Sequence, residues 1–238
     1  MATTIQTIPL INLAVTFIPA LAVIAILFKW SLNASNALYA VARMLVQLLI
    51  IGYFLVYIFE TDHAGLIIAI LTLMVFASSW IALGTIKGKR RLLYKQTLMS
   101  IGLGGGLTLI LVTQAVLALE PWYQPQFMIP LAGMIFANSM NSVSLAVERL
   151  NAEIERNVPY EEARNIALQA ALIPIINSLF AVGLVSLPGM MTGQILSGVS
   201  PLIAIRYQIM VMCMIFGSSG ISAACFLIWV RPVFEKKP

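Results

Sequence analysis

Apolar residues occur along this chain in long runs that are separated by short polar connections. The runs lack the strict alternation of a half-buried β-strand, and each is about 20 residues long, the length that an α-helix needs to cross a bilayer. Because only helices and closed barrels satisfy the backbone in lipid, the pattern predicts an all-α, polytopic transmembrane helical bundle. About seven spans are expected, at Ile8 to Phe28, Ala37 to Phe59, Ala64 to Leu83, Leu98 to Leu119, Phe127 to Val147, Ala170 to Leu187 and Tyr207 to Val230.

The composition strengthens this interpretation, since 61% of the 238 residues are hydrophobic and only 10% are charged. Soluble domains contain roughly 25% charged residues, so this chain lacks the polar surface of a water-soluble protein. The net charge of +5 comes from basic residues in short connections instead of one soluble face. We therefore expect contact with a lipid membrane and not with nucleic acid, and one membrane domain over residues 1–238.

The basic residues also predict the orientation of the chain. Of 14 Lys and Arg residues, 12 follow the first, third, fifth and seventh spans, whereas Arg43 lies inside a span and Arg206 on the opposite side. Cytoplasmic connections carry the excess of Lys and Arg in membrane proteins, so the N-terminus is predicted outside and the C-terminus inside. The residues predicted to be cytoplasmic are Lys29, Lys87, Lys89, Arg90, Arg91, Lys95, Arg149, Arg156, Arg164, Arg231, Lys236 and Lys237.

Some polar residues lie within the predicted spans, where burial in lipid is costly. Spacings of four and three residues place each of two pairs on one helix face. Counted at 1.5 Å per residue, these residues lie about 10 to 15 Å from the cytoplasmic ends of their spans. One polar layer that lines a translocation path is a hypothesis, and interhelical hydrogen bonding with a snorkelling arginine is the alternative. The candidates are Arg43, Gln47, Asn138, Asn141 and Asn177.

The cytoplasmic segment from Glu148 to Gln169 reads as two helical pieces that are separated at Asn157 to Pro159. Pro159 suits the first turn of a new helix, and acidic residues at its N-terminus interact favourably with the helix dipole. The new helix has one face of small apolar residues, so we expect a short amphipathic helix displayed to the cytoplasm. A connector along the membrane surface is the equal alternative from these residues alone.

Proline and glycine interrupt the chain after this segment. Pro174 is expected to kink the sixth span, and the stretch PGMMTGQ is expected to form a broken-helix turn or a re-entrant loop. Whether it is a packed turn or a gate that contacts substrate stays open, and the two methionines are weak candidates for soft metal ligands, so no metal site is assigned. The gate candidates are Pro188, Gly189, Met190, Met191, Thr192, Gly193 and Gln194.

Several glycines also lie within the fourth span. Gly102 and Gly106, in the sequence GLGGG, have the small-residue spacing that permits two helices to approach closely. Packing within one subunit and dimerisation are both compatible with this spacing.

Long motifs in the second half of the chain resemble those of the FetB-type ABC-transporter permeases. These motifs are Ile129 to Leu150, Leu172 to Pro201 and Arg206 to Met212, and the likeness extends over nearly the whole chain. Members of that family are implicated in bacterial iron export, and plant relatives are linked to aluminium tolerance. The resemblance implies a multi-pass permease domain in the cell's inner membrane. It also implies a separate cytoplasmic ATPase, which binds ATP and Mg and hydrolyses the ATP that drives transport. Two permease copies with two ATPases are the expected symmetric assembly.

EEAR at Glu161 to Arg164, followed by an apolar run that ends at Leu187-Pro188, is similar to the cytoplasmic loop of bacterial importer permeases, although the central glycine of that loop is missing. The similarity implies that this segment docks on the ATPase, with small residues for close approach and charges for register. The implied coupling residues are Pro159, Glu161, Glu162, Ala163, Arg164 and Ala167.

Two other function classes fit the sequence less well. A secondary transporter or channel for a small polar solute or ion would be expected to carry Asp or Glu within a span, and none of the nine acidic residues lies in one. The chain has no G-x-x-x-x-G-K-[ST] or H-E-x-x-H motif, and its one histidine, His63, lies in a predicted outer connection. We therefore expect a transport subunit with no catalytic residue and no cofactor of its own.

Overall fold

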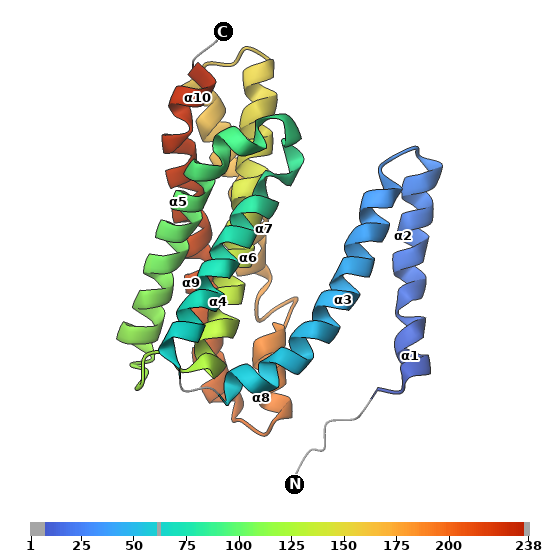
Figure 1. Cartoon of the computed structure of the whole chain (residues 1–238), viewed down its shortest axis with the longest axis vertical. Helices are drawn as coiled ribbons and strands as arrows, with labels where there is room; N and C mark the ends of the chain where they lie inside the picture. Colours follow the sequence, from blue (N-terminus) through green and yellow to red (C-terminus); the bar gives the residue numbers. More distant parts are fainter. Residues whose placement is uncertain (1–7, 61–62, 236–238) are drawn as a thin grey trace. The chain divides into compact units, whose positions relative to one another are not determined.

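The computed structural model describes residues 8–60 and 63–235, and the chain divides into two compact units, residues 1–61 and 62–238. Helices make up almost all of the described residues (Figure 1). Within those residues the only β-type pairing is the isolated bridge between Val182 and Ser186. The predicted all-α fold class is confirmed. Lys236 and Lys237, two of the predicted cytoplasmic cations, lie outside the described residues.

The first unit is a helical hairpin. It consists of α1 (Leu10–Val15), α2 (Phe17–Lys29) and α3 (Ala34–Phe59), and α2 packs beside α3 (Figure 1). Asn33 caps α3, because its side-chain oxygen accepts a hydrogen bond from the Asn36 amide at 3.2 Å. Within these described helices, Ile58 alone is buried. Such a hairpin presents nearly all of its apolar side chains outward, as a helix pair surrounded by lipid does.

The second unit is a bundle built around one long helix, α6 (Pro125–Glu155), which contacts α4, α5, α7 and α9. The four helices around it are long, and five shorter elements connect or extend them. They are α4 (Ala64–Ala82), η1 (Leu83–Thr85), η2 (Lys87–Lys89), α5 (Arg90–Ile110), the π-helix η3 (Leu111–Val116), α7 (Tyr160–Ala181), α8 (Gly189–Leu196), α9 (Pro201–Trp229) and α10 (Arg231–Glu235).

Among the described residues, six helical stretches are long and apolar enough to cross a membrane. They are Leu10–Lys29, Ala34–Phe59, Ala64–Thr85, Arg90–Val116, Tyr160–Ala181 and Pro201–Trp229. The predicted fifth span, residues 127–147, forms part of α6, which is 31 residues long but not among these six. Its buried face carries hydroxyl groups such as those of Ser139 and Ser142. A central helix that faces other helices does not need the apolar surface of one that faces lipid.

Close helix packing in the bundle depends on Gly104 and Gly105 of α5. A Cβ atom on Gly104 would lie 2.8 Å from the backbone nitrogen of Ser222 on α9, and one on Gly105 would lie 2.7 Å from the Phe136 ring on α6. Gly102 and Gly106, which the sequence pattern favoured, border a cavity of ≈ 440 Å³ instead. A Cβ on Gly106 would meet nothing within 4 Å. Close approach within the bundle thus occurs at Gly104 and Gly105, and dimerisation through Gly102 and Gly106 stays a prediction.

The expected break before α7 is confirmed, because Asn157 has a left-handed backbone (φ 62°) and Pro159 is the N-cap residue of α7. The rest of that expectation was wrong: the segment after Pro159 is not a separate short helix, since α7 runs through Pro174 to Ala181. The predicted sixth span also extended six residues too far, to Leu187. Gly183 has φ 83°, and this left-handed turn ends the helix.

Three of the four basic connections lie at one end of the second unit. The Lys89 ammonium donates to the Asn151 side-chain oxygen at 2.8 Å and lies 4.7 Å from the centre of the Phe234 ring. Arg231 pairs with Glu161 at 3.0 Å. We call this the basic end, defined by Lys89, Arg90, Arg91, Lys95, Arg149, Arg156, Arg164 and Arg231. Their shared location agrees with the predicted alternation of the spans, and the cytoplasmic location of this end stays a prediction.

Candidate functional site

The first turn of α7 is fixed to the C-terminal part of α9. Tyr160 is 7% exposed, and its hydroxyl donates a hydrogen bond to the carbonyl oxygen of Leu227. Glu161 next to it pairs with Arg231 at 3.0 Å and with Arg164 at 3.4 Å. The Arg231 guanidinium carbon also lies 5.7 Å from the centre of the Tyr160 ring. Residues from two distant parts of the chain thus hold the start of α7 in one position.

The predicted coupling residues lie together on this turn, but they face two ways. Pro159, Glu161 and Glu162 are exposed, and Arg164 is partly buried. Ala163 and Ala167 are completely buried in the bundle, because helix contacts cover the small face of α7. The expectation that this small face is displayed for docking was therefore wrong, and the surface open to a partner at this turn is the acidic one.

The basic end also contains one buried carboxylate, that of Glu153. Glu153 is 4% exposed and pairs with Arg149 at 2.6 Å and with Arg156 at 3.5 Å. A buried carboxylate is stable only when it is paired and hydrogen-bonded. This triad braces the end of α6 immediately before the break that leads into α7.

The candidate path residues divide between the two units. Arg43 and Gln47 are exposed on α3 in the first unit. In the second unit, Asn138 and Asn141 line a cavity of ≈ 90 Å³ between α6 and α7, together with hydroxyl groups such as that of Ser178. Asn177 is exposed on α7 and is not part of that lining. The shared face of the two α6 asparagines is confirmed, whereas a single layer of all five residues stays a prediction.

The PGMMTGQ stretch forms the short helix α8, which lies beside α9. Pro188 is its N-cap residue, and the Thr192 hydroxyl donates to the Pro188 carbonyl at 3.2 Å. Gly198, with φ 90°, turns the chain after α8 toward α9. The predicted broken helix is confirmed, and its role as a gate stays a prediction. Glycines 189 and 193 are exposed, whereas Met190 and Met191 are partly buried in two different cavities.

The candidate site residues predicted from the sequence omit several residues that hold the basic end and α9 in position. Tyr160 and Arg231 are 71 positions apart in the chain, so no local spacing links them. Glu153 lies in a charged stretch where sequence favours solvent exposure, and only its two arginine neighbours on the same helix face could have indicated a shared site. Gln208 of α9 is buried, like Tyr160 and Glu153, and its side-chain oxygen accepts no hydrogen bond from the described residues.

Comparison with known proteins identifies relatives along most of the chain. The model of the family described as "Uncharacterised protein family (UPF0014)" matches residues 10–164 and 155–234. A UPF0014 membrane protein of Synechocystis is 36% identical over 217 residues, which are 84% of this chain and 84% of that protein. The probable iron export permease protein FetB of Escherichia coli is 34% identical over 211 residues, which are 82% of this chain and 80% of that protein.

A plant protein shows a similar level of identity. The protein ALUMINUM SENSITIVE 3 of Arabidopsis thaliana is 33% identical over 226 residues, which are 87% of this chain and 81% of that protein. No solved structure matches this chain.

Proposed function

The chain belongs to the UPF0014 family of multi-pass membrane proteins, and from this premise we propose that it is the permease subunit of an ABC transporter that exports iron across the inner membrane. The observation that carries the proposal is the 34% identity to a relative named a probable iron export permease, over 82% of this chain. The helical stretches of both units fit a permease, since they supply the spans that such a subunit needs.

ATP hydrolysis is assigned to a separate chain. The sequence has no G-x-x-x-x-G-K-[ST] motif, whose backbone amides and lysine would cradle the phosphates of ATP. The proposed partner is a cytoplasmic ABC ATPase that holds ATP and Mg. Because the nucleotide sites of such ATPases form between two chains, a homodimer of this permease with two ATPases is the proposed assembly.

The proposed docking point is the acidic first turn of α7, where Glu161 and Glu162 are exposed. α7 is 22 residues long, so a push on its first turn is carried about 30 Å along the helix, past Pro174, at 1.5 Å per residue. The far end of α7 leads into α8. Tyr160 and Arg231 tie the same turn to the far end of α9, and the movement would therefore reach both helices that flank α8.

The proposed substrate contact within the bundle is the cavity that Asn138 and Asn141 line. Amide oxygens are hard ligands that suit a weakly held ion or a chelate, and the cavity lies between the helix that receives the push and the central helix. The Asn138 side-chain amide donates to the Met134 carbonyl at 2.8 Å, a bond that does not use its side-chain oxygen. Asn141 is exposed.

Reconstitution with the co-purifying ATPase in proteoliposomes tests the proposal. ATP-dependent Fe²⁺ flux is expected with the wild-type chain. Glu162→Lys reverses a charge at the docking turn and should weaken ATPase binding by about 2 kcal/mol or more, roughly 30-fold. Glu148→Lys makes the same charge change on an exposed residue of α6 and should bind the ATPase normally. Asn141→Leu should keep ATPase binding and lose flux.

Each result separates one part of the proposal from another. Wild-type binding and flux in Glu162→Lys would place the docking point elsewhere, with the connection from Lys87 to Lys95 next to be tested. ATP-dependent flux of another solute without Fe²⁺ flux would overturn iron as the substrate and retain the ABC mechanism. Normal flux in Asn141→Leu would leave the asparagines as packing residues.

A further inference from the structure

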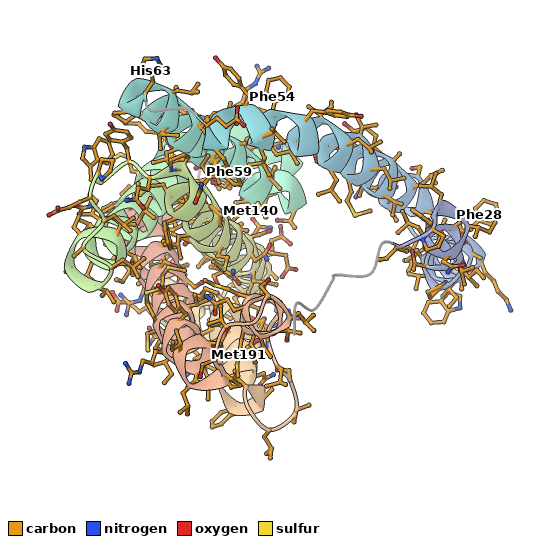
Figure 2. All side chains as sticks on the ribbon, turned by 90° about the horizontal axis from the view of Figure 1, so that it is seen from below. Phe28, Phe54, Phe59, His63, Met140 and Met191 are labelled. Atoms are coloured by element: carbon orange, nitrogen blue, oxygen red, sulfur yellow. The ribbon has the colours of Figure 1, made fainter. Side chains whose placement is uncertain are left out.

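Sulfur atoms concentrate around α8 and the start of α9. The adjacent residues Met190 and Met191 of α8 enter two separate cavities. Met190 lines a small one of ≈ 40 Å³ together with Met134 and Met210. Met191 lines a larger one of ≈ 510 Å³ together with Met212 and Cys213 of α9. Figure 2 shows Met191 on α8 where this helix lies beside α9.

The larger cavity is apolar apart from these sulfur atoms and one amide. Its other walls are aliphatic side chains such as Leu179, Leu187 and Ile205, from the end of α7, the following segment and α9. A volume of ≈ 510 Å³ lies in the range of ligand pockets in proteins, roughly 300 to 1,000 Å³. Pockets of this kind use a small number of polar groups to fix what they bind.

Gln208 is the polar group of this cavity. It lines the wall, its residue is 5% exposed, and its Oε1 atom accepts no hydrogen bond in the part of the chain that the structure describes. An unpaired buried acceptor typically costs about 1 to 3 kcal/mol. Gln208 and Met212 are four residues apart and therefore share one face of α9. The unpaired oxygen thus lies on the same face as a thioether. Cys213, the residue after Met212, also lines the cavity and is exposed.

This donor set selects a particular class of ion. Thioether and thiolate sulfur prefer soft metals such as Cu(I), whereas Mg²⁺, Ca²⁺ and Mn²⁺ prefer carboxylates and water. Among the described residues there is no cluster of three or more His, Cys, Asp or Glu side chains that could hold a metal ion. Apolar walls also favour a single charge, since the cost of burying charge rises steeply with its magnitude.

We propose that the cavity lined by Met191, Met212, Cys213 and Gln208 binds a soft monovalent metal ion, Cu(I) or Ag(I). The three sulfur atoms are the main ligands, and the Gln208 oxygen is an additional donor. On binding, the Cys213 thiol loses its proton to water and the thiolate neutralises the charge of the ion. The oxidation state of the metal does not change. The proposal is independent of iron export and of the ATPase, because it concerns equilibrium binding to this chain alone.

Titration of the full-length chain in detergent with Ag⁺, against a competing chelator of known affinity, tests the site. Met191→Leu and Met212→Leu conserve side-chain volume, so the fold should be kept while affinity falls by at least about 10-fold each. Cys213→Ser should lose more, because it removes the thiolate charge. Two matched controls, Met140→Leu on α6 and Cys225→Ser further along α9, change sulfur atoms outside the cavity and should bind Ag⁺ as the wild type does.

Gln208→Leu provides a readout that general damage to the fold would not give. It removes the unpaired oxygen, so the melting temperature of the metal-free protein should rise while Ag⁺ affinity falls. Wild-type affinity in both Met191→Leu and Met212→Leu, or an equal loss in Met140→Leu, would overturn the site. A loss confined to Cys213→Ser would show a reactive thiol without a built metal site and would also overturn the proposal.

Discussion

The two units of this molecule distribute apolar residues in opposite ways. In the first unit, helices rich in aliphatic and aromatic side chains bury one described residue, Ile58. In the second unit the central helix α6 is less apolar and has 13 buried residues, two of them serines. Hydropathy alone does not distinguish lipid-facing helices from packed ones, since α9 is as apolar as α3 and far more buried. Burial in a membrane protein follows helix contacts instead, because lipid gives no hydrophobic drive toward the core.

The largest expected difference between the units follows from truncating a phenylalanine in each. Phe136 of α6 is 4% exposed, whereas Phe54 of α3 is 58% exposed and points away from its helix (Figure 2). Phe136→Ala leaves a cavity beside Gly105 and should lower the free energy of unfolding by about 3 to 5 kcal/mol. Phe54→Ala should change it by less than about 1 kcal/mol. Denaturant unfolding in detergent measures both, and a large loss in Phe54→Ala would contradict the contrast by showing that Phe54 is packed.

A methyl group added to one glycine in each unit should give a smaller difference of opposite sign. Gly104→Ala places its Cβ 2.8 Å from the Ser222 backbone nitrogen and should cost about 1 to 3 kcal/mol through strain. Gly52 of α3 has nothing within 4 Å of such an atom. Gly52→Ala should therefore stabilise its helix by up to about 1 kcal/mol, because alanine has the higher helix propensity. Melting temperatures that fall equally in both variants would refute the close packing of α5 on α9.

The smallest expected effect comes from removing one hydroxyl group. Tyr160 is 7% exposed and donates to the Leu227 carbonyl, whereas Tyr57 of α3 is 68% exposed. Tyr160→Phe leaves that carbonyl without its donor and should cost about 1 kcal/mol. Tyr57→Phe should be neutral. Faster hydrogen exchange at the start of α7 in Tyr160→Phe alone would locate the loss, and unchanged exchange there would show that Glu161 and Arg231 hold the turn without it.

The periodicity and the length of the apolar runs were enough to predict the long helices, because each run had to be long enough to cross a bilayer. The break at Asn157 to Pro159 was predictable for a local reason, since proline and a left-handed residue both end a helix. The end of α7 was not, because Val182 is as apolar as the residues before it. Only the backbone turn at Gly183 shows that the helix has already ended.

The faces of the helices were harder to predict than their extents. Glycines 102, 104, 105 and 106 lie in one short run, and spacing alone cannot tell which of them meets another helix. For the same reason Ala163 and Ala167 were wrongly predicted to face a partner protein. A small helix face suits a partner protein and a neighbouring helix equally well. The sulfur-lined cavity was beyond sequence analysis for a different reason: Met191 and Met212 are 21 positions apart on two helices, and only the turn at Gly198 brings those helices together.

The buried triad of Glu153 and the paired Glu161 have a consequence for how a partner meets the basic end. Each of these glutamates lies between two arginines, so positive and negative charges are interleaved over distances of a few ångströms. Fields from interleaved charges cancel within about one Debye length, roughly 8 Å at physiological salt. Four cations of the basic end, Lys89, Arg90, Arg91 and Lys95, form no ion pair among the described residues, so the end keeps an excess of positive charge. Long-range attraction of an acidic protein surface would come from these four, and the rate of association would fall as ionic strength rises.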